Sequence, residues 1–137
     1  MVNELVIESP SGKKVNVHAG EFLIETDQPV AEGGEGTAPE PLTLFLASIG
    51  SCAGHYVFSF CRSRQIPTEG IRLRQRMHYD QDQHRIARIE LIIELNDSFP
   101  LKYHKALLRS ANLCSVKKHI EQAPEFVTSI ALAPGKI

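Results

Sequence analysis

The stretch PLTLFLASIGSCAGHYVFSFC, residues 41–61, decides the fold because it contains no Asp, Glu, Lys or Arg. Such a run is long enough to span a bilayer. Its serines, threonine and histidine, and the lack of a basic flank before it, favour a fully buried helix of a water-soluble protein instead. Pro41 suits a first helical turn, while Glu40 before the stretch and Arg62 and Arg64 after it complement the helix dipole. We therefore expect one long buried helix that begins near Pro41.

Small residues interrupt this helix in its middle. Gly50 and Gly54 each lower helix propensity by about 1 kcal/mol relative to Ala. Together with Ala47 and Ser51 they form a groove in which another helix can approach closely. Two interpretations remain open, namely packing within the chain and a helix crossing at a dimer interface.

On either side of the helix, apolar and polar residues alternate as they do in strands. Residues 3–26 predict a small antiparallel sheet, and residues 70–96 predict a hairpin with one apolar and one charged face. The charged face contains Arg72, Arg74 and Arg76. We expect these arginines to be solvated and paired with acids across the hairpin.

The rest of the chain completes an α+β pattern. The Gly-rich residues 27–38 predict a loop, residues 101–111 and 114–122 predict two helical segments, and residues 126–132 predict a last strand. Strands, one long helix, strands, helices and a strand differ from the repeated βαβ units of a parallel sheet.

Length and charge restrict the classes of function. The chain has 137 residues, 42% of them apolar and 23% charged, which fits a single domain over residues 1–137. Its formal net charge is −1, so we expect neither nucleic-acid binding nor a membrane contact. The charge is uneven, because two lysines accompany eight acids in residues 1–60 and thirteen Lys and Arg accompany eight acids in residues 61–137. Halves of opposite charge suit contacts within the chain or across a dimer.

Three cysteines are too few, and odd in number, for a disulfide-stapled secreted domain. The first residues lack the basic region and apolar run of a signal peptide, so we expect a reducing, cytoplasmic location. Cys52 and Cys61 lie nine residues apart and point to opposite sides of the helix. Cys61, among apolar neighbours, is expected to be a buried small side chain. Cys114 opens a predicted helix, where backbone N–H groups can lower a thiol pKa. From the residues alone, Cys52 and Cys114 are either a redox pair or two packed thiols.

The six histidines form no zinc-ligand pattern with each other or with the cysteines, so we expect no metal and no cofactor. His55 lies one helical turn after Cys52. It either raises the thiolate fraction of Cys52 or is an imidazole unrelated to chemistry. The glycines of residues 33–36 lack the Lys and Ser/Thr of a phosphate-binding loop.

Residues 33–52, GGEGTAPEPLTLFLASIGSC, closely resemble the signature of the OsmC/Ohr family. That signature is a Gly-rich loop, a Pro-containing helix start, a Leu/Ala run and a cysteine nucleophile. Residues 113–116, LCSV, resemble the second cysteine motif of the family, and the order of the predicted elements matches as well. The sequence thus resembles a divergent, OsmC-like branch.

The resemblance implies an intertwined homodimer, with antiparallel sheets packed on long central helices and active sites at the subunit interface. It further implies an enzyme of oxidative-stress defence, a thiol peroxidase that reduces organic hydroperoxides or hydrogen peroxide. Cys52 would be the peroxidatic residue and Cys114 the resolving one, and a cellular dithiol would be the reductant. The alternative is a non-catalytic small-molecule-binding or redox-responsive dimer.

Two departures from the family pattern concern the groups that would activate the thiol. Active members have a Glu ten residues before the first cysteine, whereas Glu40 lies twelve residues before Cys52 and an ungapped alignment puts Leu42 in its place. Glu40 is the third expected site residue. The N-terminal Arg of the family is missing, and a Lys in its place would lack the planar fork of a guanidinium group. The candidate substitutes are Lys13, Lys14, Arg72, Arg74 and Arg76.

Overall fold

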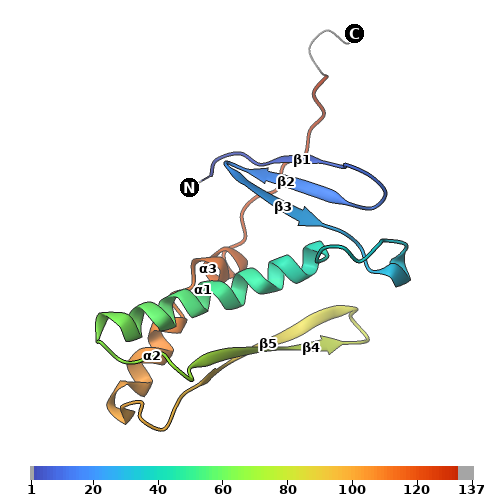
Figure 1. Cartoon of the computed structure of the whole chain (residues 1–137). Helices are drawn as coiled ribbons and strands as arrows, with labels where there is room; N and C mark the ends of the chain where they lie inside the picture. Colours follow the sequence, from blue (N-terminus) through green and yellow to red (C-terminus); the bar gives the residue numbers. More distant parts are fainter. Residues whose placement is uncertain (1, 133–137) are drawn as a thin grey trace.

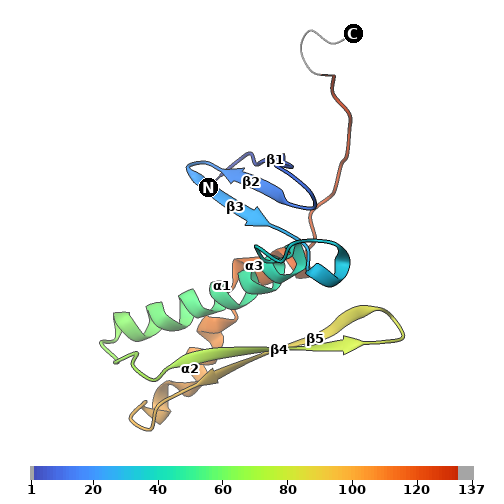
Figure 2. The same ribbon diagram turned by 45° about the vertical axis from the view of Figure 1, so that its right-hand side comes forward.

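The long helix α1 (Pro41–Ser63) lies between two antiparallel sheets in the computed structural model, which describes residues 2–132 (Figures 1 and 2). The α+β prediction is confirmed. The other elements, in chain order, are β1 (Val6–Glu8), β2 (Val15–Ala19), β3 (Phe22–Thr26), the 3-10 turn η1 (Val30–Glu32), β4 (Arg72–Asp80), β5 (Arg85–Glu94), the 3-10 turn η2 (Leu101–Tyr103), α2 (His104–Ala111) and α3 (Ser115–Glu121).

The first sheet contains β1, β2 and β3 in that order, as the alternation in residues 3–26 predicts. All its strands are antiparallel, with Ile7 opposite Val17 and Val17 opposite Ile24. Apolar side chains of this sheet nevertheless remain in contact with solvent, since Phe22 is 75% and Ile7 59% exposed. The sheet therefore has apolar surface that the rest of residues 2–132 does not cover.

A buried carboxylate organises the Gly-rich loop that leads into α1. Asp27, only 1% exposed, accepts hydrogen bonds from the backbone N–H groups of Gln28, Glu35 and Thr37 and from the Thr37 hydroxyl. These bonds, above all that from the Thr37 amide, lower the pKa of Asp27 to about 2. A Cβ at Gly34 would lie 1.9 Å from the Gln28 carbonyl oxygen, so the loop closes only around a glycine.

The helix α1 begins at Pro41, as predicted, but its burial differs from the prediction. Only the side facing β4, α2 and α3 is buried within the chain, and Leu42 and Phe45 remain about half exposed. By length and composition α1 could cross a membrane, a test that the core helix of a soluble protein also passes, and 33% of its most apolar window is buried. Because the whole stretch is uncharged, its sequence alone does not distinguish burial of α1 within its own chain from burial against another chain.

Gly50 accounts for the close approach of α1 and the hairpin. A Cβ at this position would lie 2.7 Å from Oε1 of Gln75 on β4, and Nε2 of the same Gln75 donates to the Leu46 carbonyl oxygen at 3.0 Å. Of the two interpretations of the small residues, packing within the chain therefore holds at Gly50. The neighbour is a strand side chain rather than a second helix.

The second sheet is the predicted hairpin of β4 and β5, paired from Arg72 opposite Glu94 to Asp80 opposite Arg85, with an irregularity after His78. Arg72 and Arg74 both donate to the Glu94 carboxylate. The expected solvated face with acids across the hairpin is thus confirmed for these two arginines.

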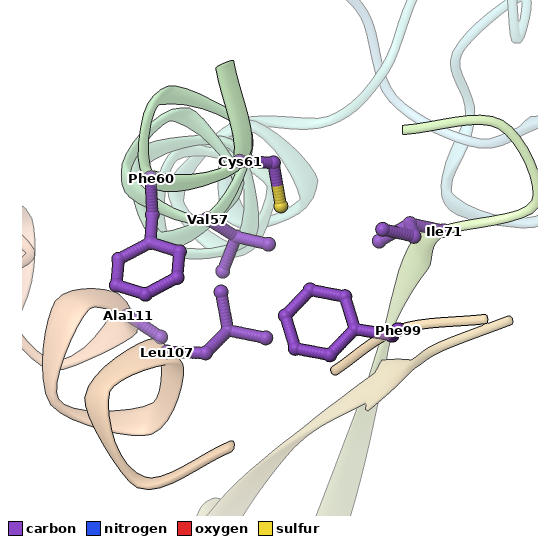
Figure 3. Close-up of a cluster of buried hydrophobic side chains, with 7 residues drawn as sticks. All are labelled: Val57, Phe60, Cys61, Ile71, Phe99, Leu107 and Ala111. Carbon is purple, nitrogen blue, oxygen red and sulfur yellow. The ribbon is translucent and has the colours of Figure 1, made fainter. Parts of the chain in front are cut away.

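The core forms where α1, α2 and the start of β4 meet. Its buried side chains pack around Leu107, which is 1% exposed and lies close to Phe99 in the close-up of Figure 3. Cys61 belongs to this cluster, as its apolar neighbours predict, and burial raises the pKa of its thiol. The members of the cluster are Val57, Phe60, Cys61, Ile71, Phe99, Leu107 and Ala111.

The strand predicted over residues 126–132 is absent from the described residues of this chain. After α3 the chain runs past the β1–β3 sheet as an extended segment (Figures 1 and 2). Phe126 is 86% and Ile130 94% exposed. The alternation that predicts a strand is present, but a strand also needs a neighbouring edge, and within residues 2–132 no sheet edge pairs with the segment.

Candidate active site

Two of the three predicted site residues are brought together, although they are 62 positions apart in the sequence. Cys52 lies in the middle of α1 and is partly exposed, whereas Cys114 is fully buried at the N-cap of α3. The Cys114 thiol donates to the carbonyl oxygen of Ile49, one turn before Cys52, at 3.9 Å. Each thiol influences the pKa of the other.

The segment after the second cysteine supplies the other contacts of Cys52. Ser115 Oγ lies 3.8 Å from Cys52 Sγ. The backbone N–H groups of Ser115 and Val116 also lower the pKa of the Cys52 thiol. These donors are available because they belong to the first residues of α3, whose N–H groups have no partner within the helix.

The Cys52 thiol has a pKa below its ordinary value. The largest cause is the backbone N–H of Val116, opposed by partial burial and supported by the Cys114 thiol and by Ser115. The N–H groups of Val116 and Ser115 and the Ser115 hydroxyl are neutral donors, which favour the thiolate form of Cys52. Cys52 therefore exists as thiolate, the nucleophilic form, to a greater extent than a free cysteine at the same pH.

The Cys114 thiol has the opposite shift, contrary to the prediction that its position at a helix start lowers its pKa. Burial raises its pKa, and the neighbouring Cys52 raises it further. The Lys117 amide, which donates to Cys114 Sγ at 3.4 Å, acts against burial without outweighing it. The helix start thus lowers the pKa of the cysteine that faces it from α1 rather than that of its own first cysteine.

Glu40 lies at the N-cap of α1 and makes no side-chain capping bond there. Twelve residues of helix separate it from Cys52, about 18 Å along the axis, so the chain does not bring the two together. His55 is exposed and contacts the ring of Tyr56 edge-on, with 5.5 Å between ring centroids. It is not among the main influences on Cys52.

The cations proposed to replace the missing Arg have other partners or face solvent. Lys13 donates to the Glu32 carbonyl oxygen, and Lys14 pairs with Glu35 at 2.9 Å. Arg72 and Arg74 are bound to Glu94, as described above, and Arg76 is exposed on β4. None of them takes the place of the missing Arg at Cys52 within this chain. Over residues 2–132, no cluster of three His, Cys, Asp or Glu side chains could hold a metal ion.

Sequence reasoning missed Ser115 and the Val116 amide as partners of Cys52. A signal existed, since a Ser directly after Cys114 lies in the first turn of the predicted helix and must point near whatever faces that helix. Sequence reasoning also missed that Asp27 organises the Gly-rich loop. The available signal was its position directly before that stretch, because an Asp side chain readily accepts hydrogen bonds from nearby backbone N–H groups.

Comparison with known proteins places this arrangement in a family. The model of the family described as OsmC-like protein matches residues 34–129, which include both Cys52 and Cys114. The chain belongs to the OsmC-like protein family. No match to this OsmC-like chain is found among curated proteins.

Solved structures share the fold of this OsmC-like chain. A protein from Psychrobacter arcticus, described as an osmotic stress induced and detoxification response protein, has a TM-score of 0.69 at 22% identity, with 83% of this chain and 85% of the other covered. An OsmC-like protein from Mycoplasma pneumoniae has a TM-score of 0.64 at 13% identity, covering 88% and 86%. The organic hydroperoxide resistance protein OsmC from Legionella pneumophila has a TM-score of 0.50 at 18% identity, covering 88% and 90%. At these identities the likeness shows the fold, while activity must be argued from the site.

Proposed function

We propose that this OsmC-like chain is a cysteine-based peroxidase that reduces organic hydroperoxides or hydrogen peroxide. The observation that carries the proposal is the placement of a partly exposed Cys52 against the start of α3, where Cys114 is fully buried and Ser115 Oγ lies 3.8 Å from Cys52 Sγ. In this placement the pKa of Cys52 is lowered and that of Cys114 is raised. The partly exposed thiolate suits attack on a small oxidant, and the buried protonated thiol suits the later step. That a family member from Legionella pneumophila is described as an organic hydroperoxide resistance protein supports the choice of oxidant.

The proposed cycle has three steps. The Cys52 thiolate attacks the terminal oxygen of ROOH, the O–O bond breaks, and with one proton from solvent the products are Cys52 sulfenic acid and ROH. The Cys114 thiol then attacks the Cys52 sulfur, forming a disulfide and releasing the sulfenic oxygen as water. A cellular dithiol finally reduces the disulfide by exchange and is itself oxidised to a disulfide. The cycle needs no cofactor, and it suits a reducing, cytoplasmic location.

We propose in addition that the working form is a homodimer. The argument is the apolar surface that one chain leaves uncovered, on the β1–β3 sheet, on the first turns of α1 and along the extended residues 124–132. A segment with Phe126 and Ile130 almost fully exposed is unfavourable in water unless another surface covers it. Sedimentation that shows a stable monomer would contradict the proposal.

Peptide mass spectrometry after one equivalent of cumene hydroperoxide tests the peroxidase. We expect a disulfide between Cys52 and Cys114, no peroxide consumption by Cys52→Ser, and a trappable sulfenic acid at Cys52 in Cys114→Ser. Cys61→Ala is the matched control, since Cys61 belongs to the core and should not affect turnover.

A Cys52 that titrates as an ordinary thiol and does not react with peroxide would favour the alternative, a non-catalytic binding or redox-responsive dimer. One observation supports that alternative. A groove of about 510 Å³ between β5 and the helices α2 and α3 is lined largely by apolar side chains and reaches Ile49, whose carbonyl oxygen contacts Cys114.

A further inference from the structure

Cys52 has a side-chain partner that is not among the expected site residues. Within hydrogen-bonding reach of its sulfur is the hydroxyl of Ser115, at 3.8 Å. Among residues 2–132, Cys52 is the one hydrogen-bond partner of the Ser115 hydroxyl. A hydroxyl can donate one hydrogen bond and a thiolate can only accept, so ionisation of Cys52 fixes the direction of the bond from Ser115 to the sulfur.

The position of Ser115 is held by the backbone rather than by its own side chain. The Ser115 carbonyl oxygen accepts a hydrogen bond at 2.7 Å from Nδ1 of the His119 side chain, one turn later in α3. The preceding residue, Cys114, is anchored by its contacts with the Ile49 carbonyl oxygen and the Lys117 amide. Because the serine side chain is short, holding its hydroxyl against Cys52 costs little side-chain conformational entropy. A Lys or Arg at the same position would lose more conformational entropy on being held there.

We propose that Ser115 is a catalytic residue of this chain, whose hydroxyl donates to the Cys52 thiolate and orients it for attack on the hydroperoxide. This inference rests on the proposed function, since it assigns a role in the same reaction. The hydroxyl supplies part of the stabilisation that the missing Arg would have provided, together with the neighbouring amides of α3. No proton leaves Ser115 in the step, because it donates a hydrogen bond to the thiolate and keeps its proton while the O–O bond of the peroxide breaks.

The role predicts a pH-dependent signature that a structural role does not share. Removing one donor to a thiolate should raise the pKa of Cys52 by about one unit. Below the pKa, the thiolate fraction then falls about tenfold while the more basic thiolate becomes about threefold more reactive, which leaves a net loss of about threefold. Above the pKa, only the threefold gain in reactivity remains. The pH–rate profiles of Ser115→Ala and the unmodified protein should therefore cross.

The test is the rate of thiol–disulfide exchange of the full chain with dithiodipyridine, measured on both sides of the pKa, with the modified cysteine identified by peptide mass spectrometry. Ser115→Thr, which keeps the hydroxyl, should follow the unmodified profile. Ser110→Ala is the matched control, because the Ser110 hydroxyl also joins a neighbouring helix to α1, donating to the Tyr56 carbonyl oxygen at 3.2 Å. Its profile should not shift.

Each result decides. A crossing in Ser115→Ala that is absent in Ser115→Thr and Ser110→Ala supports the proposal. Profiles that do not cross, or an equal shift in Ser110→Ala, overturn it, because they show either no hydrogen bond or a general loosening. The probe needs no peroxidase activity, so the two proposals fail separately. A crossing in a protein that leaves cumene hydroperoxide untouched would keep Ser115 as a thiolate partner but overturn its catalytic role along with the proposed function.

Discussion

Leu107→Ala should strongly destabilise the fold, because Leu107 lies at the centre of the core that joins α2 to α1. Its side chain is 1% exposed and packs with Val57, Phe60 and Phe99. The substitution removes three carbon atoms, and at about 0.8 kcal/mol for each buried CH₂ the lost transfer free energy is roughly 2.4 kcal/mol. A cavity that does not collapse raises the total cost to as much as about 5 kcal/mol.

Denaturant unfolding at a fixed protein concentration measures this cost, and the concentration is fixed because the proposed dimer would contribute to apparent stability. The matched control is Leu101→Ala, whose side chain in η2 is 81% exposed and whose loss should change stability by less than about 0.5 kcal/mol. In a thermal scan, Leu107→Ala should melt roughly 8–20 °C lower. Equal effects of the two substitutions, or a cost of Leu107→Ala below about 2 kcal/mol, the least that a buried leucine should cost, would refute this account of the core.

Three further predictions concern other parts of the chain. Since the pKa of Asp27 is about 2 in the folded protein against an ordinary 3.8, its contribution to stability is complete above pH 3.8 and is lost as the pH falls through 2. Unfolding curves at successively lower pH should show this loss. Asp27→Asn should be less stable at neutral pH and should lack this part of the acid dependence. Cys61→Ser places a hydroxyl in the apolar cluster and should cost about 1–3 kcal/mol in denaturant unfolding, while the reaction rate of Cys52 stays unchanged; a slower Cys52 would mean that the two cysteines are not independent. The double substitution Phe126→Asp and Ile130→Asp should shift sedimentation from dimer to monomer, and an unchanged dimer would show that these side chains lie outside the interface.

The sequence predicted best those features that depend on local pattern. The start of α1 at Pro41, the hairpin of β4 and β5 and the burial of Cys61 all follow from spacing and flanking residues, and the structure confirms them. It predicted less well the features that depend on which surface lies opposite. Gly50 marks close packing in either interpretation, and only the fold shows that Gln75 is its neighbour.

The same limit applies to the site. A likeness to known motifs selected Cys52 and Cys114, and the structure brings the start of α3, with Cys114 and Ser115, against the turn of α1 that contains Cys52. Which of the two thiols has the lowered pKa depends on the direction of the N–H groups of α3 and on the depth of Cys114, and neither is encoded in the spacing of the cysteines. The strand predicted over residues 126–132 illustrates the point differently, because the alternating pattern is present while residues 2–132 form no strand there.

The sulfur of Cys114 has a second task, which affects how substitutions there are interpreted. It accepts the Lys117 amide at the start of α3 and so holds the first turn of that helix, the turn that presents Ser115 and Val116 to Cys52. Cys114→Ala would remove the thiol and also the N-terminal cap of α3. Cys114→Ser would remove only the thiol, because serine is a preferred N-cap residue. A kinetic defect seen with alanine but not with serine would therefore report on architecture and say nothing about sulfur chemistry.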